Sequence, residues 1–315
     1  MYIVTGGAGF IGANIVEGLN LRGESDILVV DNLEKSAKFH NLIDLEFADF
    51  LDKRDFRDLI EKGRFDHARI RGIFHQGACS DTMEYDGRYM MDNNFAYSKL
   101  LFHFAVEREI PFVYASSAAT YGNGTRFTEE RSSEDPLNIY GYSKLLFDRY
   151  VERRLADVES TVAGLRYFNV YGPRELHKGR MASMVYQSYR QLRDDGTTWL
   201  FQGTGGYGDG EQRRDFIYVR DVVDVNLFLA DGVPVQGIFN VGTGQSCSFN
   251  DIVHALIEIT GRGELKYKPM PDGLREKYQN FTEADITRLR RAGYDRPFTS
   301  LKEGVREYVA RLREE

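Results

Sequence analysis

The sequence predicts an α/β fold built on a doubly wound parallel sheet, and three features of the chain support this prediction. Short, almost continuously apolar runs alternate with helix-length segments in the first half, as in parallel sheets that helices cover on both faces. A glycine-rich loop follows the first apolar run, and an aspartate ends the second. Right-handed crossovers between such strands produce an open sheet whose ligand site lies at the carboxyl ends of the strands.

The first half of the chain supplies the strands of this sheet and the helices between them. The apolar runs predict strands at Tyr2–Thr5, Ile27–Val30, Leu45–Phe47, Gly72–His75, Phe112–Ser116 and Thr161–Arg166. The intervening segments predict helices at Ile11–Leu21, Phe56–Lys62, Asn93–Arg108 and Tyr142–Leu155. We therefore expect residues 1–171 to form the sheet domain, to which some later segments return.

The second half changes in character from about residue 172 onward. Helices are expected at Ala182–Arg193 and Val222–Ala230, and short strands at Trp199–Gln202, Phe216–Val219 and Ile238–Val241. Capping boxes predict helix starts at Ser248 with Asp251, Thr282 with Asp285 and Ser300 with Glu303. The five glycines of Gly203–Glu211 predict a mobile loop. Residues 172–315 are thus expected to form mainly a smaller, mixed α/β lobe.

The composition argues against several classes of protein. The 315 residues include 41 Lys and Arg against 48 Asp and Glu, and a net charge of −7 argues against a nucleic-acid binder or a protein attracted to anionic lipid. Cys79 and Cys247 lie far apart in no metal-ligand spacing, so neither a zinc site nor a disulfide framework is expected. The chain has no apolar run of membrane-spanning length and no recognisable export signal. We expect a cytoplasmic protein without metal, nucleic-acid or membrane partners.

The glycine-rich loop TGGAGFIG begins at Thr5 and opens directly into a helix. Gly6, Gly9 and Gly12 allow a tight turn, a close approach of a pyrophosphate and close helix–strand packing, and the helix N-terminus attracts the phosphates. Asp31 follows Gly12 by 19 residues, about the spacing of an acid that binds the adenosine ribose. Together these features favour a dinucleotide site over a purely structural turn.

The residues around Asp31 leave the choice of dinucleotide open. A carboxylate repels a ribose 2′-phosphate, so Asp31 alone favours NAD. Lys38 and Lys53 follow closely, and they would neutralise that phosphate if they face the ribose rather than solvent. The residues by themselves therefore admit both NAD and NADP.

Tyr140 and Lys144 form a Y-x-x-x-K pair at the start of a helical stretch. This spacing places both on one helix face, and an ammonium beside a phenol favours the phenolate, which exchanges protons with an alcohol or a ketone. Ser117 follows an expected strand and is a candidate to bind the reacting oxygen. The pair alone would be more common as a surface feature, but with the glycine loop it predicts hydride-transfer chemistry.

Several motifs resemble those of the extended short-chain dehydrogenase/reductase family, whose sheet domain has the Rossmann fold. These motifs are TGGAGFIG, SSAATYG, YGYSK and RYFNVYGPR. Longer runs resemble one branch, the ADP-glyceromanno-heptose 6-epimerases, and extend from the first strand to near the last helix. The longer runs are KFHNLIDLEFADFLDK, HQGACSDT, YMMDNN, YASSAATYG, PLNIYGYSKLLFD, RYFNVYGPRELHKGRMAS and YQNFTEADITRLRRAGYDRPF.

The resemblance implies that NADP, rather than NAD, is bound tightly, with one molecule in each subunit. The implied cofactor residues are Gly6, Gly9, Phe10, Ile11, Gly12, Asp31, Asn32, Lys38, Lys53, Gln76, Gly77, Ala78, Cys79, Ser80, Asn93, Lys144, Val170 and Lys178. The implied substrate residues are Asn169, Arg180, Gln187, Phe201, Gln202, Gly203, Thr204, Arg214 and Tyr278. Family members often have Glu, Ser and His at the positions of Gln76, Arg180 and Gln187, so the departures concern the rim of the cofactor site and the sugar pocket.

The resemblance also implies an isomerase that inverts C-6 of the heptose in ADP-D-glycero-β-D-manno-heptose, by transient oxidation to a ketone and re-reduction. Tyr140, with Lys144 and Ser117, would serve one epimer and Lys178 the other. The product would supply heptose for the inner core of lipopolysaccharide. Family members form homopentamers, which implies a homo-oligomer.

Three other functions fit parts of the pattern. A nucleotide-sugar 4-epimerase would use NAD and the same Tyr–Lys pair, and its product would distinguish it. A 4,6-dehydratase would need an acid just after the strand-end serine, where Ala118 stands. A regulatory protein that only senses dinucleotides would tend to lose the Tyr–Lys pair, which is intact here.

Overall fold

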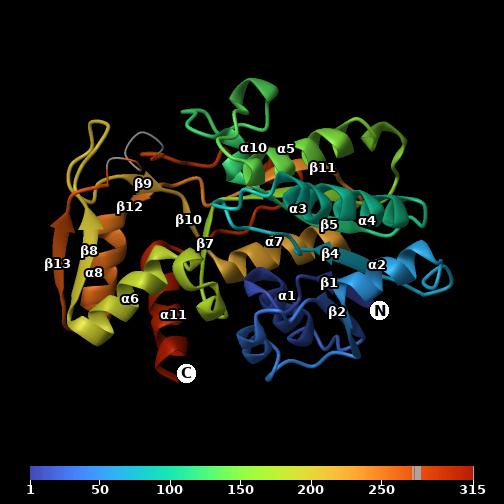
Figure 1. Ribbon diagram of the computed structural model, residues 1–315, viewed down its shortest axis with the longest axis horizontal. Coiled ribbons are helices and arrows are strands. Elements are labelled where there is room, and N and C mark those ends of the chain that lie inside the picture. Colours follow the sequence, from blue (N-terminus) through green and yellow to red (C-terminus); the bar gives the residue numbers. More distant parts are fainter. Residues whose placement is uncertain (272, 274–277, 315) are drawn as a thin grey trace. The chain divides into compact units, whose positions relative to one another are not determined.

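The structure is a computed structural model that describes residues 1–271, 273 and 278–314. Seven strands form one central sheet (Figure 1). The strand order is β11-β6-β5-β4-β1-β2-β3, and β1 pairs in parallel with both β2 and β4. The expected α/β class, with a Rossmann-like doubly wound sheet, is confirmed. The bounds are β1 Tyr2–Thr5, β2 Ile27–Asp31, β3 Asp49–Asp52, β4 Gly72–His75, β5 Phe112–Ser117, β6 Val162–Tyr167 and β11 Gln236–Val241.

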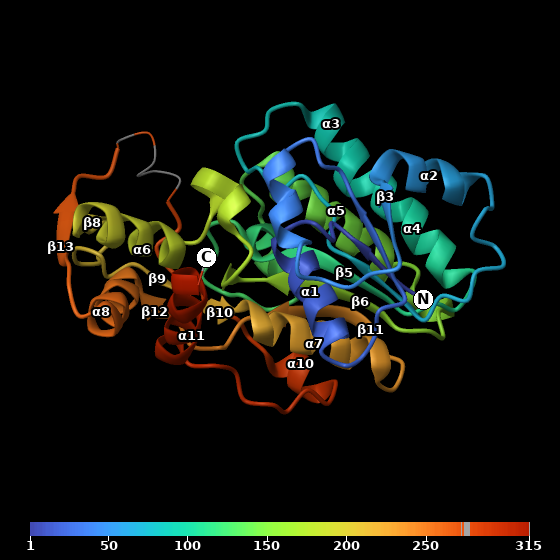
Figure 2. The same ribbon diagram turned by 90° about the horizontal axis from the view of Figure 1, so that it is seen from below.

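Helices cover both faces of this sheet, and its inner strands are therefore buried on both sides, whereas the edge strand β3 is partly exposed. On one face, Phe56 of α2, Leu101 of α4 and Phe147 of α5 belong to a single apolar cluster with Ile3 and Val30 of the strands. On the opposite face α1 lies against α7 (Figure 2). Gly18 of α1 leaves room there for the Val223 side chain of α7. The bounds are α1 Phe10–Asn20, α2 Lys53–Glu61, α3 Gly87–Met91, a π-helical turn Asp92–Ala96, α4 Tyr97–Val106, α5 Ile139–Glu152 and α7 Val219–Asp231.

The chain folds into two compact units, each built from separate segments. The first contains Met1–Thr120, Pro136–Arg166 and Val222–Phe239, and the second contains Tyr121–Asp135, Tyr167–Asp221 and Asn240–Glu315. The sequence leads us to expect one main cut near residue 171 with some later return. The contacts divide the chain at several points, since β11 and most of α7 belong with the sheet and Tyr121–Asp135 belongs to the second unit.

The second unit is a mixed α/β structure with three small sheets. β7 pairs in parallel with β10, β8 in parallel with β13, and β9 antiparallel with β12. Figure 1 shows α6 and α8 beside the β8–β13 pair, and α11 packs on α8. The bounds are β7 Asn169–Tyr171, α6 Met184–Asp195, β8 Thr197–Phe201, β9 Arg213–Arg214, β10 Phe216–Tyr218, β12 Cys247–Ser248, α8 Phe249–Thr260, β13 Glu264–Lys268, α10 Thr287–Arg291 and α11 Leu301–Glu314.

Two expected elements are wrong, and side-chain hydrogen bonds explain both. Leu45–Phe47 is loop rather than strand, because the Asn20 side chain binds both the N–H and the carbonyl of Glu46, at 2.9 and 2.7 Å. Thr282 starts no helix, because its hydroxyl accepts the N–H of Asp215 at 3.3 Å. The capping box of Ser248 and Asp251, in contrast, is present at the start of α8.

The glycine segment Gly203–Glu211, expected to be a mobile loop, is held by hydrogen bonds. The N–H of Gly203 donates to the carboxylate of Asp209 at 2.8 Å, and the N–H of Gly210 donates to the carbonyl of Phe201 at 3.0 Å. The Thr204 hydroxyl donates to Asn280 at 2.9 Å. The glycines therefore lie in a loop of two hydrogen-bonded turns.

Candidate active site

The glycine loop lies at the point where the strand order reverses, between the ends of β1 and β4. Gly6 has a φ of 68°, and a Cβ on it would lie 2.6 Å from the backbone nitrogen of Gly77, in the loop after β4. A Cβ on Gly12 would overlap the carbonyl oxygen of Gly6. Gly9 is the N-cap of α1 and makes no side-chain cap hydrogen bond, and the positive end of the helix dipole at this N-terminus attracts an anion. This cradle fits the pyrophosphate of a dinucleotide.

Asp31 ends β2 beside this cradle, and its carboxylate is already bound on both oxygens. It accepts hydrogen bonds from the N–H groups of Ala8, at 2.9 Å, and Asn32, at 2.7 Å. It also forms an ion pair with Lys38 at 2.7 Å. The ammonium of Lys38 also donates to the backbone and side-chain oxygens of Asn32, at 3.0 and 3.1 Å. Because the Asp31 and Lys38 side chains are only 8% and 16% exposed, they act as one nearly neutral unit.

Lys53 lies at the same edge of the sheet, because the strand register pairs Asp31 with Asp52, the residue before it. Its ammonium donates to the side chain of Asn93 at 2.7 Å, and Asn93 in turn donates to the carbonyl of Tyr89 at 2.9 Å. The structure thus brings together Lys53 and Asn93, which the sequence assigned to the cofactor separately.

Asn94, which the sequence reading missed, fastens the loop Gln76–Ser80 to the rest of the site. It is fully buried in the π-helical turn, where it accepts the N–H of Cys79 at 2.8 Å and donates to its carbonyl at 2.9 Å. It also donates to the hydroxyl of Ser143 at 3.1 Å, which itself donates to the carbonyl of Tyr140 at 2.7 Å. Widened helical turns of this kind frequently occur at functional sites.

Ser117, Tyr140 and Lys144 meet at the carboxyl end of β5 and the first turns of α5. The helix begins at Ile139, earlier than predicted, because the side chain of Asn138 caps it by accepting the N–H of Gly141 at 2.8 Å. Tyr140 and Lys144 therefore share one helix face. Ser117 hydrogen-bonds to the Tyr140 phenol, and the Lys144 ammonium donates to the carbonyl of Ala115 at 2.8 Å.

Burial sets the protonation of this pair. It raises the pKa of the Tyr140 phenol, against the hydrogen bond from Ser117, which lowers it. It lowers the pKa of Lys144 to about 8, against the carboxylate of Asp148, which raises it. At pH 7 the lysine is therefore a cation on the same helix face as a neutral phenol, which can donate a proton. The phenol can accept a proton only as the phenolate, and a nearby ammonium favours that form.

Lys178 lies in the second unit, in a 3₁₀ turn at Leu176–Met181. Burial lowers its pKa, and the neighbouring carboxylate of Glu175 opposes this. Glu175 is itself buried and held by the N–H and the hydroxyl of Ser183, at 2.5 and 2.6 Å.

Arg214 is the centre of a second cluster in the same unit. Its guanidinium lies over the ring of Tyr278 at 5.2 Å, and it donates to the carbonyls of Arg213 and Gln279. Tyr278 meets Phe201 edge-on at 6.3 Å. Burial lowers the pKa of Arg214, so this cation is held in a poorly solvated place where it would bind an anion strongly.

The other residues that the sequence assigned to the substrate are spread over the second unit. Gln202 accepts a hydrogen bond from Gln212 through its carbonyl at 3.1 Å, next to Gly203 and Thr204 in the loop described above. Gln187 donates to the carbonyl of Gly179 at 2.7 Å, which ties α6 to the Lys178 turn. Asn169 lies on β7, next to Val170, which was assigned to the cofactor, and Arg180 is exposed.

A comparison with family models matches residues 2–242 to the NAD dependent epimerase/dehydratase family. The chain belongs to this family. Two similar proteins are named ADP-L-glycero-D-manno-heptose-6-epimerase. The one from Alkalilimnicola ehrlichii is 54% identical over 98% of this chain and 96% of its own, and the one from Thiobacillus denitrificans is 52% identical over 98% of both.

Solved structures of this epimerase/dehydratase family share the fold over the whole chain. The Helicobacter pylori ADP-L-glycero-D-manno-heptose-6-epimerase has a TM-score of 0.88 at 30% identity, covering 100% of this chain and 96% of its own. A UDP-glucose 4-epimerase from Thermotoga maritima has a TM-score of 0.81 at 30% identity, covering 99% of this chain and 98% of its own.

The described residues of this epimerase/dehydratase chain offer neither a metal site nor a membrane span. Within residues 1–271, 273 and 278–314, no three His, Cys, Asp or Glu side chains are grouped to bind a metal ion. Over the same described part of the chain, no helix is both long and apolar enough to cross a membrane.

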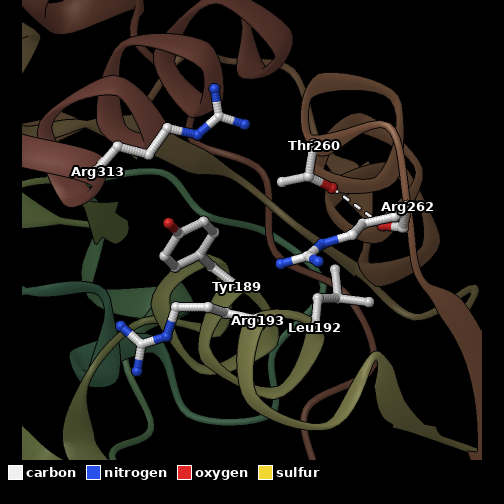
Figure 3. A pocket seen from close by; sticks show the side chains of 6 residues that line it. All are labelled: Tyr189, Leu192, Arg193, Thr260, Arg262 and Arg313. Atoms are coloured by element: carbon white, nitrogen blue, oxygen red, sulfur yellow. Dashed lines mark hydrogen bonds between the residues drawn. The ribbon is translucent and has the colours of Figure 1, made fainter.

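A pocket of about 220 Å³ also lies in the second unit, among α6, α8 and α11 (Figure 3). Arg193 there pairs with Asp194 at 2.7 Å, and Arg313 donates to the carbonyl of Ile259 near the end of α8 at 3.4 Å. These arginines lie near the C-terminal ends of their helices, whose dipoles they complement. The lining consists of Tyr189, Leu192, Arg193, Thr260, Arg262 and Arg313, and differs from the residues predicted for cofactor and substrate.

Proposed function

We propose that this protein is an isomerase that converts ADP-D-glycero-β-D-manno-heptose into ADP-L-glycero-β-D-manno-heptose by inverting C-6 of the heptose. One observation carries the proposal: Ser117, Tyr140 and Lys144 meet at the carboxyl end of β5, in the unit that holds the glycine cradle. The substrate is taken from the names of relatives that are 54% and 52% identical over nearly the whole chain. The product would supply heptose for the inner core of lipopolysaccharide.

NADP is the cofactor that the residues at the edge of β2 and β3 favour. An unpaired carboxylate at Asp31 would repel a 2′-phosphate, but here the ammonium of Lys38 forms an ion pair with the carboxylate and offsets its negative charge. Lys53 adds a second cation at the same edge, so a phosphate there would meet two ammonium groups. A nicotinamide dinucleotide held by this edge and the glycine cradle supplies reversible hydride transfer at the substrate carbon. Gln76–Ser80, Asn93 and Val170 complete the proposed cofactor residues.

The side chains of the protein move the protons. As the phenolate, the form that the Lys144 cation favours, Tyr140 takes the proton of the C-6 hydroxyl in one epimer and becomes the neutral phenol, while Ser117 hydrogen-bonds to the reacting oxygen. Lys178 performs the same task for the other epimer, because burial has lowered its pKa toward the range in which an amine acts as a base. Two groups are needed because the carbonyl presents opposite faces in the two halves of the reaction.

The cluster around Arg214 is proposed to hold the nucleotide part of the substrate. Its buried guanidinium suits a diphosphate, and the rings of Phe201 and Tyr278 offer apolar contacts next to it. Asn169, Arg180, Gln187 and the segment Gln202–Thr204 are proposed to contact the rest of the ADP-heptose. We also propose a homo-oligomer in the cytoplasm, a compartment that suits two unpaired cysteines.

The decisive experiment is incubation of the purified protein with ADP-D-glycero-β-D-manno-heptose, with NMR detection of the C-6 epimer. UDP-glucose serves as the comparison substrate, because a 4-epimerase would convert it and leave the heptose unchanged. Mass spectrometry of the nucleotide released on denaturation should give NADP, because an enzyme that returns the hydride to its substrate has no need to release the cofactor. Release of NAD would contradict the cofactor assignment. Light scattering measures the oligomeric state.

A further inference from the structure

Asp148 lies on α5 one helical turn after Lys144, and polar side chains of β5 and β6 enclose its carboxylate. Tyr114 and Ser116 of β5 donate hydrogen bonds to it at 3.0 and 2.8 Å, and Arg166 of β6 forms an ion pair with it at 2.9 Å. The Asp148 side chain is 0% exposed and that of Arg166 1%. The catalytic scheme above does not use this cluster.

Stability alone is a poor reason for such a cluster. Both charges lose their hydration on burial, and replacing a buried ion pair by apolar residues of similar volume is often neutral or stabilising. The same strand, β5, fills buried positions with apolar side chains at Phe112 and Val113. A charged group at Asp148 therefore suggests an effect on a neighbour, and the neighbour one turn away on the same helix face is Lys144.

The titratable groups on α5 and in the segments around Lys144 differ in charge at neutral pH. His75 of β4 is neutral, because burial and the lysine itself lower its pKa to about 3. The thiol of Cys79, in the loop after β4, is neutral because burial raises its pKa. The phenol of Tyr140 is neutral because burial raises its pKa as well. Burial raises the pKa of the Asp148 carboxyl, and the ion pair with Arg166 and the hydrogen bonds from Ser116 and Tyr114 oppose this rise. Because it pairs with the Arg166 guanidinium at 2.9 Å, Asp148 supplies the anion in this group.

We propose that Asp148 is a positioning residue for Lys144: its fixed carboxylate keeps the lysine protonated on the helix face that carries Tyr140. Arg166, Tyr114 and Ser116 hold the carboxylate in place and keep it ionised. The inference rests on the proposed function, because the chemistry of the Tyr–Lys pair is assigned there.

The direction of the effect follows from the electrostatics of a buried site. Burial already lowers the pKa of Lys144 to about 8, and the carboxylate of Asp148 raises it. Without that carboxylate the pKa of Lys144 should fall further, by about one unit. At pH 7.5 most molecules would then carry a neutral lysine, and the phenol of Tyr140 would lose the cation that eases its ionisation.

Asp148→Asn tests this, because it removes the charge and keeps the size of the side chain. Tyr114→Phe is the matched control, since it deletes one hydrogen bond to the same carboxylate and leaves the charge. In protein labelled with [ε-¹³C]lysine, the Lys144 signal can be assigned by its loss in Lys144→Arg. Its titration midpoint should lie near pH 8 in the unaltered protein and in Tyr114→Phe, and about one unit lower in Asp148→Asn. An unchanged midpoint in Asp148→Asn overturns the proposal.

A second variant covers the case in which Asp148→Asn leaves Arg166 uncompensated and fails to fold. The double change Asp148→Asn with Arg166→Gln removes both charges, and the same shift of the Lys144 midpoint is expected in it. The alkaline limb of the kcat profile should move to lower pH by the same amount, whereas a purely structural role would lower Tm and leave the midpoint unchanged. Because the NMR titration needs no substrate, absence of epimerase activity in the unaltered protein would count against the proposed function alone.

Discussion

Replacing Lys38 by alanine should weaken the binding of NADP far more than that of NAD. The ammonium of Lys38 lies 2.7 Å from a carboxylate oxygen of Asp31, and the two side chains are only 16% and 8% exposed. The change therefore removes a cation from the proposed 2′-phosphate site and also leaves a nearly buried carboxylate without its counter-charge. Both effects act against a phosphate, and neither acts against a free 2′-hydroxyl.

The size of the effect can be estimated from one lost charge-assisted hydrogen bond. Such a bond is worth about 1.5–3 kcal/mol, which corresponds to a loss of about 10- to 150-fold in affinity for NADP. The affinity for NAD should stay the same or rise, because the released carboxylate of Asp31 can accept a bond from the ribose hydroxyl.

The assay is isothermal titration calorimetry of each dinucleotide on protein from which bound cofactor has been removed. Lys35→Ala is the matched control, because Lys35 is an exposed lysine in the same segment and should have little effect on either cofactor. A thermal melt of each variant shows whether the fold is retained. Equal losses for NADP and NAD in Lys38→Ala would refute the role of this lysine.

Three further results are expected. Tyr140→Phe and Lys178→Met should each slow epimerisation about 10²- to 10⁴-fold, and a nearly normal rate in Lys178→Met would show that one base serves both faces. Asn94→Leu should lower the free energy of unfolding by about 2–4 kcal/mol, because it leaves the N–H and the carbonyl of Cys79 without the hydrogen bonds that Asn94 makes to them. A loss below about 1 kcal/mol in urea titrations would contradict the role of Asn94 in holding this loop. Burial lowers the pKa of His75 to about 3, so on acidification the histidine becomes protonated in the unfolded state before it does in the folded state. The free energy of unfolding should therefore fall as the pH drops below 6.5, by about 3 kcal/mol at pH 4.5. His75→Gln should flatten that part of the curve, and an unchanged acid sensitivity would exclude His75 as its cause.

The sequence predicts the sheet well because local signals and burial agree there. The apolar runs that form β1 and β4 are buried on both faces, and the expected bounds match the observed ones. Residues 45–47 were wrongly predicted to form a strand, because their apolar side chains lie in a loop. The actual edge strand, β3, has two aspartates among its four residues. Pairing with β2, which no local pattern encodes, makes that segment a strand.

Only part of the candidate site could be predicted from the sequence, for a related reason. Gly6, Tyr140 and Lys144 have spacings that reflect one loop or one helix face, so the sequence alone picks them out. Asn94 and Asp148 act through partners distant in sequence, at Cys79 and Arg166, and an isolated Asn or Asp in a helical stretch carries no such signal. The side chain next to a predicted residue can thus matter as much as the residue itself, as Asn94 does beside Asn93.

Because Val222–Phe239 belongs to the first unit, that unit cannot be completed as the chain leaves the ribosome in order. β6 borders β11 in the sheet, and the N–H of Val162 donates to the carbonyl of Val235 at 3.1 Å. At translation rates of about 5–20 residues per second, β6 waits roughly 4–15 s for its partner. During that interval the nascent protein exposes an unpaired strand edge of the kind that recruits other chains. A gene fragment cut at residue 171 would make this exposure permanent, so its product should aggregate rather than fold.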